Sequence, residues 1–117
     1  MSETAPIAFS DNDWLVCPVC GNDYLHQGSV AIYHLSPPEG LNMERQVLVD
    51  TDTNTVDDGL IPAGTLMNPS HTGREGMRIS FYCEGECDVP DLVISQGKGN
   101  TTIEWGHDSK LPKANGW

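Results

Sequence analysis

The sequence predicts a small β-rich domain built from about five short, mainly antiparallel strands. Its 117 residues are the length of one domain, and its 12 glycines and 8 prolines favour turns over long helices. No amphipathic run of ten or more residues predicts a helix. The apolar fraction of 38% is below the ~45–50% of an ordinary globular chain on a count that includes glycine. A core this small gains most from an additional cross-link.

The composition divides the chain into three parts. Residues 1–13 are polar and acidic, and we expect this lead to be loosely ordered. Residues 14–106 contain every strand-like segment and form the single predicted domain, and residues 107–117 form a polar tail. The lead lacks the basic and apolar regions of a signal peptide, and no stretch has the ~18 apolar residues that span a membrane. We therefore expect a cytoplasmic protein with no membrane contact.

The first two predicted strands cover residues 29–35 and 46–50. In the first, Val30, Ile32 and His34 point to one face and the intervening residues point to the other. The Pro-Pro-Glu-Gly run at 37–40 ends this strand with strong turn chemistry. Residues 51–75, rich in Thr, Asp, Asn and Gly, are expected to form a long irregular loop.

The remaining strands follow this loop. Residues 77–82 alternate between apolar and polar and lead directly into Cys83. Residues 92–95 and 101–105 are two further strand-like runs, joined by the glycine-rich segment 97–100. This arrangement predicts a β-hairpin.

The four cysteines form two closely spaced pairs, Cys17 with Cys20 and Cys83 with Cys87. Thiolates at such spacing are ligands for a tetrahedral zinc ion, and Gly21 after the first pair permits the tight turn that a metal knuckle needs. We predict one zinc on all four cysteines. Four thiolates leave no coordination position for water, so this zinc is expected to be structural rather than catalytic.

Other uses of the cysteines stay open. An iron–sulfur cluster, free thiols, or replacement of one cysteine ligand by His26 are alternatives. A redox Cys-x-x-Cys is expected near a βαβ pattern, which the sequence lacks. Disulfides need an oxidising compartment, which nothing in the sequence indicates.

Charge is distributed unevenly. The formal net charge is −11, and residues 1–58 contain ten acids against the single base Arg45. Direct nucleic-acid binding needs the opposite sign and is not expected. An acidic surface suits a protein partner that is itself basic, such as a nucleic-acid-binding protein, and the candidate contact residues are in the acidic loop. These residues are Asp50, Asp52, Asp57 and Asp58.

A resemblance adds an origin but no activity. The segment that begins at Cys17-Pro-Val-Cys-Gly, the segment 73–85 and the segment 96–105 resemble a group of small zinc-ribbon proteins found in actinobacteria and their phages. The resemblance spans residues 14–106. It implies a zinc ribbon with four cysteine ligands and a phage origin, which would place the protein in the host cytoplasm.

We therefore expect a non-enzymatic, zinc-stabilised acidic binding protein that engages or inhibits a host macromolecule. One alternative is a small-molecule binder or enzyme that uses the 51–75 loop and His71. Another is a structural accessory protein in a larger assembly, which would expose an apolar patch. The oligomeric state and the partner's identity do not follow from the sequence.

Overall fold

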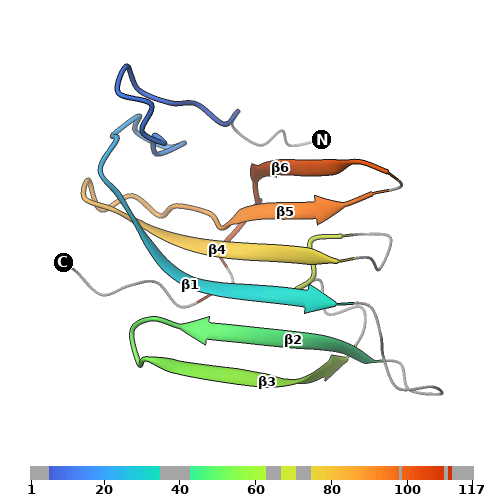
Figure 1. Ribbon diagram of the computed structural model, residues 1–117. Helices are drawn as coiled ribbons and strands as arrows, with labels where there is room; N and C mark the ends of the chain where they lie inside the picture. Colours follow the sequence, from blue (N-terminus) through green and yellow to red (C-terminus); the bar gives the residue numbers. More distant parts are fainter. Residues whose placement is uncertain are drawn as a thin grey trace.

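The computed structural model describes residues 6–34, 43–62, 67–70, 75–97, 99–109 and 111. They form one six-stranded sheet in which every neighbouring pair is antiparallel, in the order β3-β2-β1-β4-β5-β6 (Figure 1). The strands are β1 (Leu25–His34), β2 (Met43–Asp50), β3 (Thr55–Pro62), β4 (Gly76–Cys83), β5 (Leu92–Gln96) and β6 (Thr101–Trp105). The described part of the chain contains no helix with the length and apolar character needed to cross a bilayer.

The predicted β-rich, antiparallel architecture is confirmed, with six strands where about five were expected. The additional strand is β3, which lies inside the segment 51–75 that we expected to be an irregular loop. A tight turn makes this strand possible: the Asp50 carboxylate accepts hydrogen bonds from the backbone N–H groups of Asp52 (3.0 Å) and Thr53 (3.3 Å), and Asn54 takes a positive φ of 60°. Because β3 is an exposed edge strand, it needs little of the apolar pattern by which strands are recognised.

A β-bulge bends β1. Between Gln27 and Val30 the register with β4 shifts, so that two residues of β1 oppose one residue of β4. The amide of Ser29, which the bulge removes from the ladder, donates to the Ser80 hydroxyl at 2.8 Å. The start of β1 stays paired with the end of β4, and the bend directs it toward the N-terminal segment (Figure 1).

One face of the sheet, here called the covered face, is buried over its central strands β1 and β4 and exposed toward its edges. It carries Ala31, Tyr33 and Leu48, which pack with Met67 of the segment 67–70 and with Leu111. Arg78, also on this face, is buried and forms an ion pair with the buried Asp91, with Nη1 and Oδ2 3.4 Å apart. Its Nε also donates to the carbonyl of Met67. The covered face therefore combines a small apolar cluster with a buried charged pair.

The opposite face, here called the open face, is apolar but largely uncovered. Residues that pair directly across antiparallel strands share a face, so the observed register defines its members. They come from all six strands: Val30, Ile32, Val47, Val49, Val56, Leu60, Met77, Ile79, Leu92, Ile94 and Ile103. None of them is fully buried, and Ile32, Val56, Leu60 and Ile103 are exposed.

Candidate metal centre

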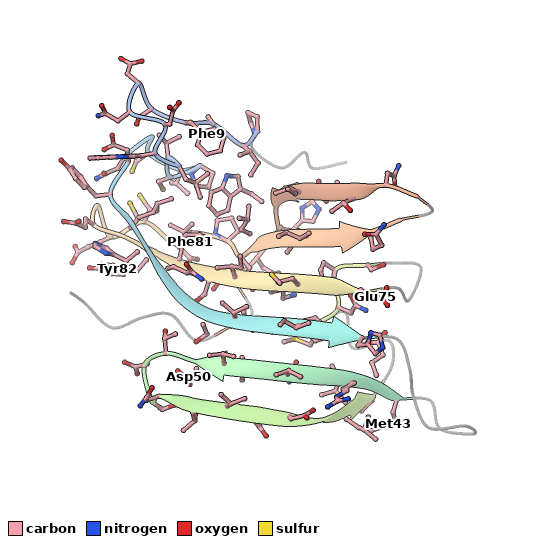
Figure 2. The ribbon with its side chains drawn as sticks, viewed as in Figure 1. Phe9, Met43, Asp50, Glu75, Phe81 and Tyr82 are labelled. Carbon is pink, nitrogen blue, oxygen red and sulfur yellow. The ribbon has the colours of Figure 1, made fainter. Side chains whose placement is uncertain are left out.

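A small lobe, here called the metal lobe, consists of residues 6–24 and 84–91 and sits at one end of the sheet (Figure 1). Its N-terminal part folds back on itself through a β-bridge between Phe9 and Leu15 and a hydrogen bond from the Val16 amide to the Ala8 carbonyl (3.1 Å). Part of the segment 1–13 is thus hydrogen-bonded, and residues 1–5 lie outside the described residues. Figure 2 shows Phe9 in this lobe and Phe81 on β4 below it.

The first knuckle is a tight turn around Cys17 and Cys20. The Gly21 amide donates to the Cys17 carbonyl (2.9 Å), and the Cys17 amide donates to the Asn22 carbonyl (2.7 Å). The amide of Val19 points at the Cys17 sulfur, 3.4 Å away. Gly21 has a φ of +79°, so the glycine predicted to permit this turn occupies the left-handed conformation it was expected to supply.

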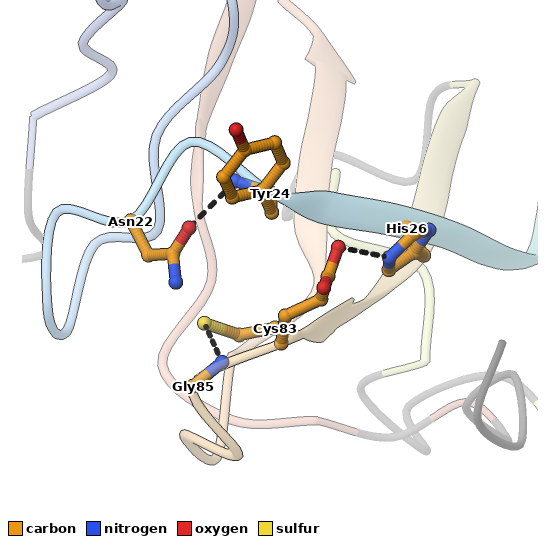
Figure 3. A network of polar contacts seen from close by, with 6 residues as sticks. Asn22, Tyr24, His26, Cys83 and Gly85 are labelled. Atoms are coloured by element: carbon orange, nitrogen blue, oxygen red, sulfur yellow. Dashed lines mark hydrogen bonds and ion pairs between the residues drawn. The ribbon is translucent and has the colours of Figure 1, made fainter.

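The second knuckle begins where β4 ends, at Cys83. The Gly85 amide donates to the Cys83 sulfur (3.3 Å), as Figure 3 shows, and the Glu86 amide donates to the Cys83 carbonyl (2.8 Å). The left-handed residue here is Glu86, with a φ of 61°, rather than a glycine. The extra residue between Cys83 and Cys87 is therefore accommodated by a strained backbone position.

The two knuckles bring all four predicted ligands together. The sulfur atoms of Cys17, Cys20, Cys83 and Cys87 all lie within 4.8 Å of one another. The sulfurs of Cys20 and Cys83 are 3.7 Å apart, too far for a disulfide, and all four cysteines are unbridged. Four sulfurs this close can hold one metal ion between them.

Hydrogen bonds among the sulfurs, together with burial, shift the pKa values of three of the cysteines in different directions. A backbone hydrogen bond from Asn22 and a side-chain hydrogen bond from Cys87 are the main causes that lower the pKa of Cys20 to about 7. The hydrogen bond to Cys20, together with burial, raises the pKa of Cys87 to about 12, and burial raises the pKa of Cys83. A bound cation would favour the thiolate form of all four cysteines.

The metal centre is joined to the sheet by an apolar cluster. Cys17 and Cys83 are buried beside Val89 and Trp105, and Phe81 meets the Trp105 ring edge-on with centroids 5.6 Å apart. Cys20 is exposed and Cys87 is half-buried. The knuckles are thus anchored on their inner side and open to solvent on their outer side.

The histidines occupy other positions. His26 is not part of the sulfur cluster: its Nε2 lies 2.9 Å from the Glu84 carboxylate (Figure 3). His34 Nδ1 lies 3.3 Å from the Glu75 carboxylate, and His107 is exposed. His71, the histidine of the alternative enzyme hypothesis, lies outside the described residues.

The four candidate partner-binding aspartates do not form one surface. Asp50 lies at the end of β2, well away from Phe9 (Figure 2), and its carboxylate caps the β2–β3 turn. Asp52 lies in that turn. Asp57 and Asp58 are consecutive on β3 and point to opposite faces, and Asp58 is held by Arg45 through two contacts of 2.7 and 3.0 Å. The Arg45 guanidinium holds the pKa of Asp58 below its usual value.

The sequence did not predict that apolar side chains of the metal lobe are exposed, and its interpretation of Trp14 as a core or half-buried strand residue was wrong. Phe9, Val19 and Tyr24 are 55–61% exposed, and Trp14 is 47% exposed. The rings of Trp14 and Tyr24 are neighbours, with centroids 6.1 Å apart. A hydrogen bond from the Tyr24 amide to the Asn22 side chain (2.8 Å) anchors the backbone beneath them (Figure 3). The sequence shows that three of these residues are aromatic, but it does not show that they are exposed.

Comparison with known proteins adds no relative to this description. No protein-family model, no curated protein and no solved structure matches the chain. The resemblance to actinobacterial and phage zinc-ribbon proteins therefore stays a prediction from the sequence, and the description of the site rests on its geometry.

Proposed function

We propose that this protein is a non-enzymatic binding module, that one zinc ion on its four cysteines is structural, and that its metal lobe recognises a basic partner. The single observation that carries the proposal is the metal lobe itself. There, four clustered cysteines support a surface that is acidic and that exposes aromatic side chains.

The donor set favours zinc. With zinc–sulfur bonds of ~2.3 Å, the sulfurs of a tetrahedral site lie ~3.8 Å apart, and the Cys20–Cys83 separation is 3.7 Å. Zinc–thiolate sites closed by four cysteines are structural in other proteins because no position remains for water or substrate. The metal would connect residues 17–20 with residues 83–87 and so close a loop of 62 residues. We therefore assign the metal to folding.

The charge of the metal lobe supports a basic partner. The metal lobe, residues 6–24 and 84–91, contains no lysine or arginine, and its Asp91 is buried and paired with Arg78 of β4, so the other acids give the lobe its charge. These acids are Asp11, Asp13, Asp23, Glu84, Glu86 and Asp88. A zinc ion bound by four thiolates carries a further net charge of about −2. Such a concentration of one sign attracts a partner of the opposite sign and accelerates its association.

The exposed aromatic side chains supply the contact energy that charge alone does not. Tryptophan and tyrosine are enriched among the residues that dominate binding energy at protein interfaces. The face of an aromatic ring such as Trp14 also attracts an arginine or lysine side chain. The favoured partner is therefore a basic surface or segment of another protein. A nucleic-acid-binding groove is one such surface, and inhibition of a host protein of that class is the form our proposal takes for a phage protein.

Binding of a basic probe peptide would test this proposal. We suggest a lysine- and arginine-rich peptide, titrated into the zinc-loaded chain at ~0.05 M and ~0.5 M salt, with fluorescence anisotropy as the readout. Binding should weaken by at least about tenfold at the higher salt concentration. The variant Trp14→Ala and the double variant Asp23→Asn/Glu86→Gln should each weaken binding at low salt.

A matched control uses the acids at the opposite end of the molecule. The double variant Asp52→Asn/Asp57→Asn removes the same number of charges from the β2–β3 ribbon and should leave binding almost unchanged. Binding that depends on these two aspartates and not on the metal lobe would overturn the assignment of the surface. Binding that is indifferent to salt would overturn the electrostatic basis of the proposal.

The enzyme or small-molecule alternative loses one of its premises. It depended on a long irregular loop at 51–75, whereas residues 55–62 form the regular strand β3. A rise in melting temperature on addition of nucleotides or metabolites would nevertheless favour it.

A further inference from the structure

We propose that the open face of the sheet is the interface of a homodimer, in which two copies of this chain pack face to face. This inference does not depend on the proposed function of the metal lobe. It follows from the composition, charge and size of the open face.

The composition of the strands fits a sheet that is buried on both faces. A sheet with one solvated face alternates between apolar and polar residues, whereas strands buried on both sides have continuous apolar runs. Continuous runs occur here in three strands: residues 30–33 in β1, 47–49 in β2 and 92–94 in β5. In each run, one set of side chains lies on the covered face and the other lies on the open face.

Every strand contributes an apolar residue to the open face, although one row ends in Asp58 on β3. The row through Ile32 runs Val47, Ile32, Met77, Ile94, Ile103 from β2 to β6. A shallow hollow on this face is lined by Ile32, Glu75, Gly76, Met77, Ile94 and Gln96. Contiguous apolar patches on monomers are rarely larger than ~300–600 Å². A patch to which every strand contributes therefore indicates an interface.

Charge distinguishes the open face from the rest of the molecule. The chain carries a net charge of −11, which opposes self-association through most of its surface. On the open face, however, Asp58 is paired with Arg45 (2.7 Å) and Glu75 lies beside His34 (3.3 Å). The described residues of this face thus have almost no net charge. A second copy can approach there without the repulsion that it meets elsewhere, whereas a basic partner gains nothing from this face.

The area of the open face is sufficient for a dimer. Six strands ~4.8 Å apart span ~24 Å, and a strand of five residues spans ~16 Å, which gives a flat projection of ~380 Å² for the face, including the end that the metal lobe covers. The accessible area of the side chains that stand on this plane is larger. It therefore approaches the ~600–800 Å² per partner of a specific interface. Two such faces would pack ~10 Å apart, as the sheets of a β-sandwich do.

The symmetry of the dimer follows from the position of the metal lobe. The lobe covers the open face at only one end, over Trp105, Phe81 and Leu92. A two-fold axis that lies in the plane between the two packed faces, perpendicular to the direction from the middle of the face to the lobe, would place the two lobes at opposite ends. The acidic lobes would then lie far apart, and each apolar face would meet its symmetry mate.

The test compares two neighbouring residues of β6 that point to opposite faces. Ile103 lies on the open face and Thr102 on the other, and both are exposed. Sedimentation equilibrium of the zinc-loaded full chain should show a mass near twice 12.8 kDa at micromolar concentration. Ile103→Asp should weaken dimerisation by at least about tenfold, because a two-fold interface buries the new charge twice. Thr102→Asp should leave the dimer intact.

The control measurement is the circular dichroism spectrum of each variant, which should match that of the unsubstituted chain because both positions are exposed. Ile32→Asp, at the centre of the open face, provides a second disrupting variant. A chain that stays monomeric at all concentrations would overturn the proposal. So would a dimer that resists both Ile103→Asp and Ile32→Asp, since association would then use an edge strand or the metal lobe.

Discussion

The two ends of a single row of the sheet differ sharply in their surroundings. The row runs from Val56 on β3 through Val49, Val30, Ile79 and Leu92 to Trp105 on β6. Trp105 is 1% exposed beneath the metal lobe, whereas Val56 is 70% exposed. Both residues are apolar and both lie on edge strands. The difference between them is the metal lobe, which covers one end of the row and not the other.

The described part of the chain thus buries its apolar surface at one end of the sheet and leaves it exposed at the other. At the Trp105 end, the sulfurs of two cysteine pairs lie close enough to hold one metal ion, which would cross-link a short, irregular segment of chain to the sheet. At the Val56 end, no such cross-link is available to the described residues. We therefore propose that a metal stabilises the Trp105 end and that a second copy of the chain covers the Val56 end.

Removal of a metal ligand should cause the largest loss of stability. Cys83→Ser should unfold the covered end or the whole chain, because apparent zinc-binding energies of ~10–16 kcal/mol exceed the usual stability of a domain. Circular dichroism and thermal unfolding with and without a chelator would measure this. Chelation of the unsubstituted chain should have the same effect. A variant that stays folded with an unchanged melting temperature would contradict the structural role of the metal.

The next largest effect is the difference in the loss of stability between substitutions at the two ends of the row. Trp105→Ala should destabilise the chain by about 3–5 kcal/mol, because it leaves a large cavity beneath the metal lobe. Val56→Ala, at the other end, should change the stability of the monomer by no more than about 0.5 kcal/mol. Urea unfolding below the dimerisation range would measure both. Equal losses at the two positions would show that the ends are not different.

Tyr33, on the covered face, provides a test of stability that depends on neither the Trp105 end nor the Val56 end of the row. Burial raises the pKa of Tyr33 to about 12, from an ordinary value of 10. The native chain therefore binds the phenolic proton more tightly than the unfolded chain, and this contribution is complete below pH 10. As the pH rises from about 10 to 12, about 2–3 kcal/mol of stability should be lost.

Tyr33→Phe should abolish this part of the alkaline loss. The Tyr33 hydroxyl is buried and has no hydrogen-bond partner among the described residues, so its removal should also leave the stability at neutral pH unchanged or raise it by about 1 kcal/mol. Urea unfolding at several pH values would follow both effects. Tyr24→Phe, at an exposed tyrosine, is the matched control and should keep the alkaline loss. A Tyr33→Phe variant with the same pH dependence as the parent would contradict the assignment.

The smallest effects distinguish the two knuckles. Gly21 and Glu86 both have positive φ, but only Gly21 tolerates it without strain. Gly21→Ala should therefore destabilise the zinc-loaded chain by about 1 kcal/mol, and Glu86→Gly should stabilise it by a similar amount. Thermal unfolding would measure both, with Glu86→Gln as the control for the lost charge. Stabilisation by Glu86→Gln equal to that by Glu86→Gly would show that charge, not backbone strain, matters there.

Much of this arrangement was predictable because its determinants are local. The cysteine spacing and Gly21 indicated the first knuckle, and the alternation in residues 77–82 indicated most of β4. The hairpin of β5 and β6 lies where the glycine-rich segment 97–100 predicts it. These features depend on a few neighbouring residues, so a single sequence is enough to find them.

The features that the sequence did not predict depend on packing between distant segments. β3 is stabilised by its pairing with β2 and by the turn at Asp50, so its own composition resembles a loop. Arg78 alternates with apolar neighbours as a solvent-facing residue would, yet the covering segment and Asp91 bury it. The exposure of the open face depends on which segments pack against it, and among the described residues few do, which no periodicity reveals.

Native mass spectrometry of the full chain, recorded before and after chelation, tests the central claim most directly. We expect one zinc ion per chain, bound to a compact species with few charges. Once the metal is removed, the spectrum should shift to the highly charged ions of an unfolded chain. A compact, metal-free chain, or a zinc ion whose removal leaves the charge-state distribution unchanged, would contradict this claim.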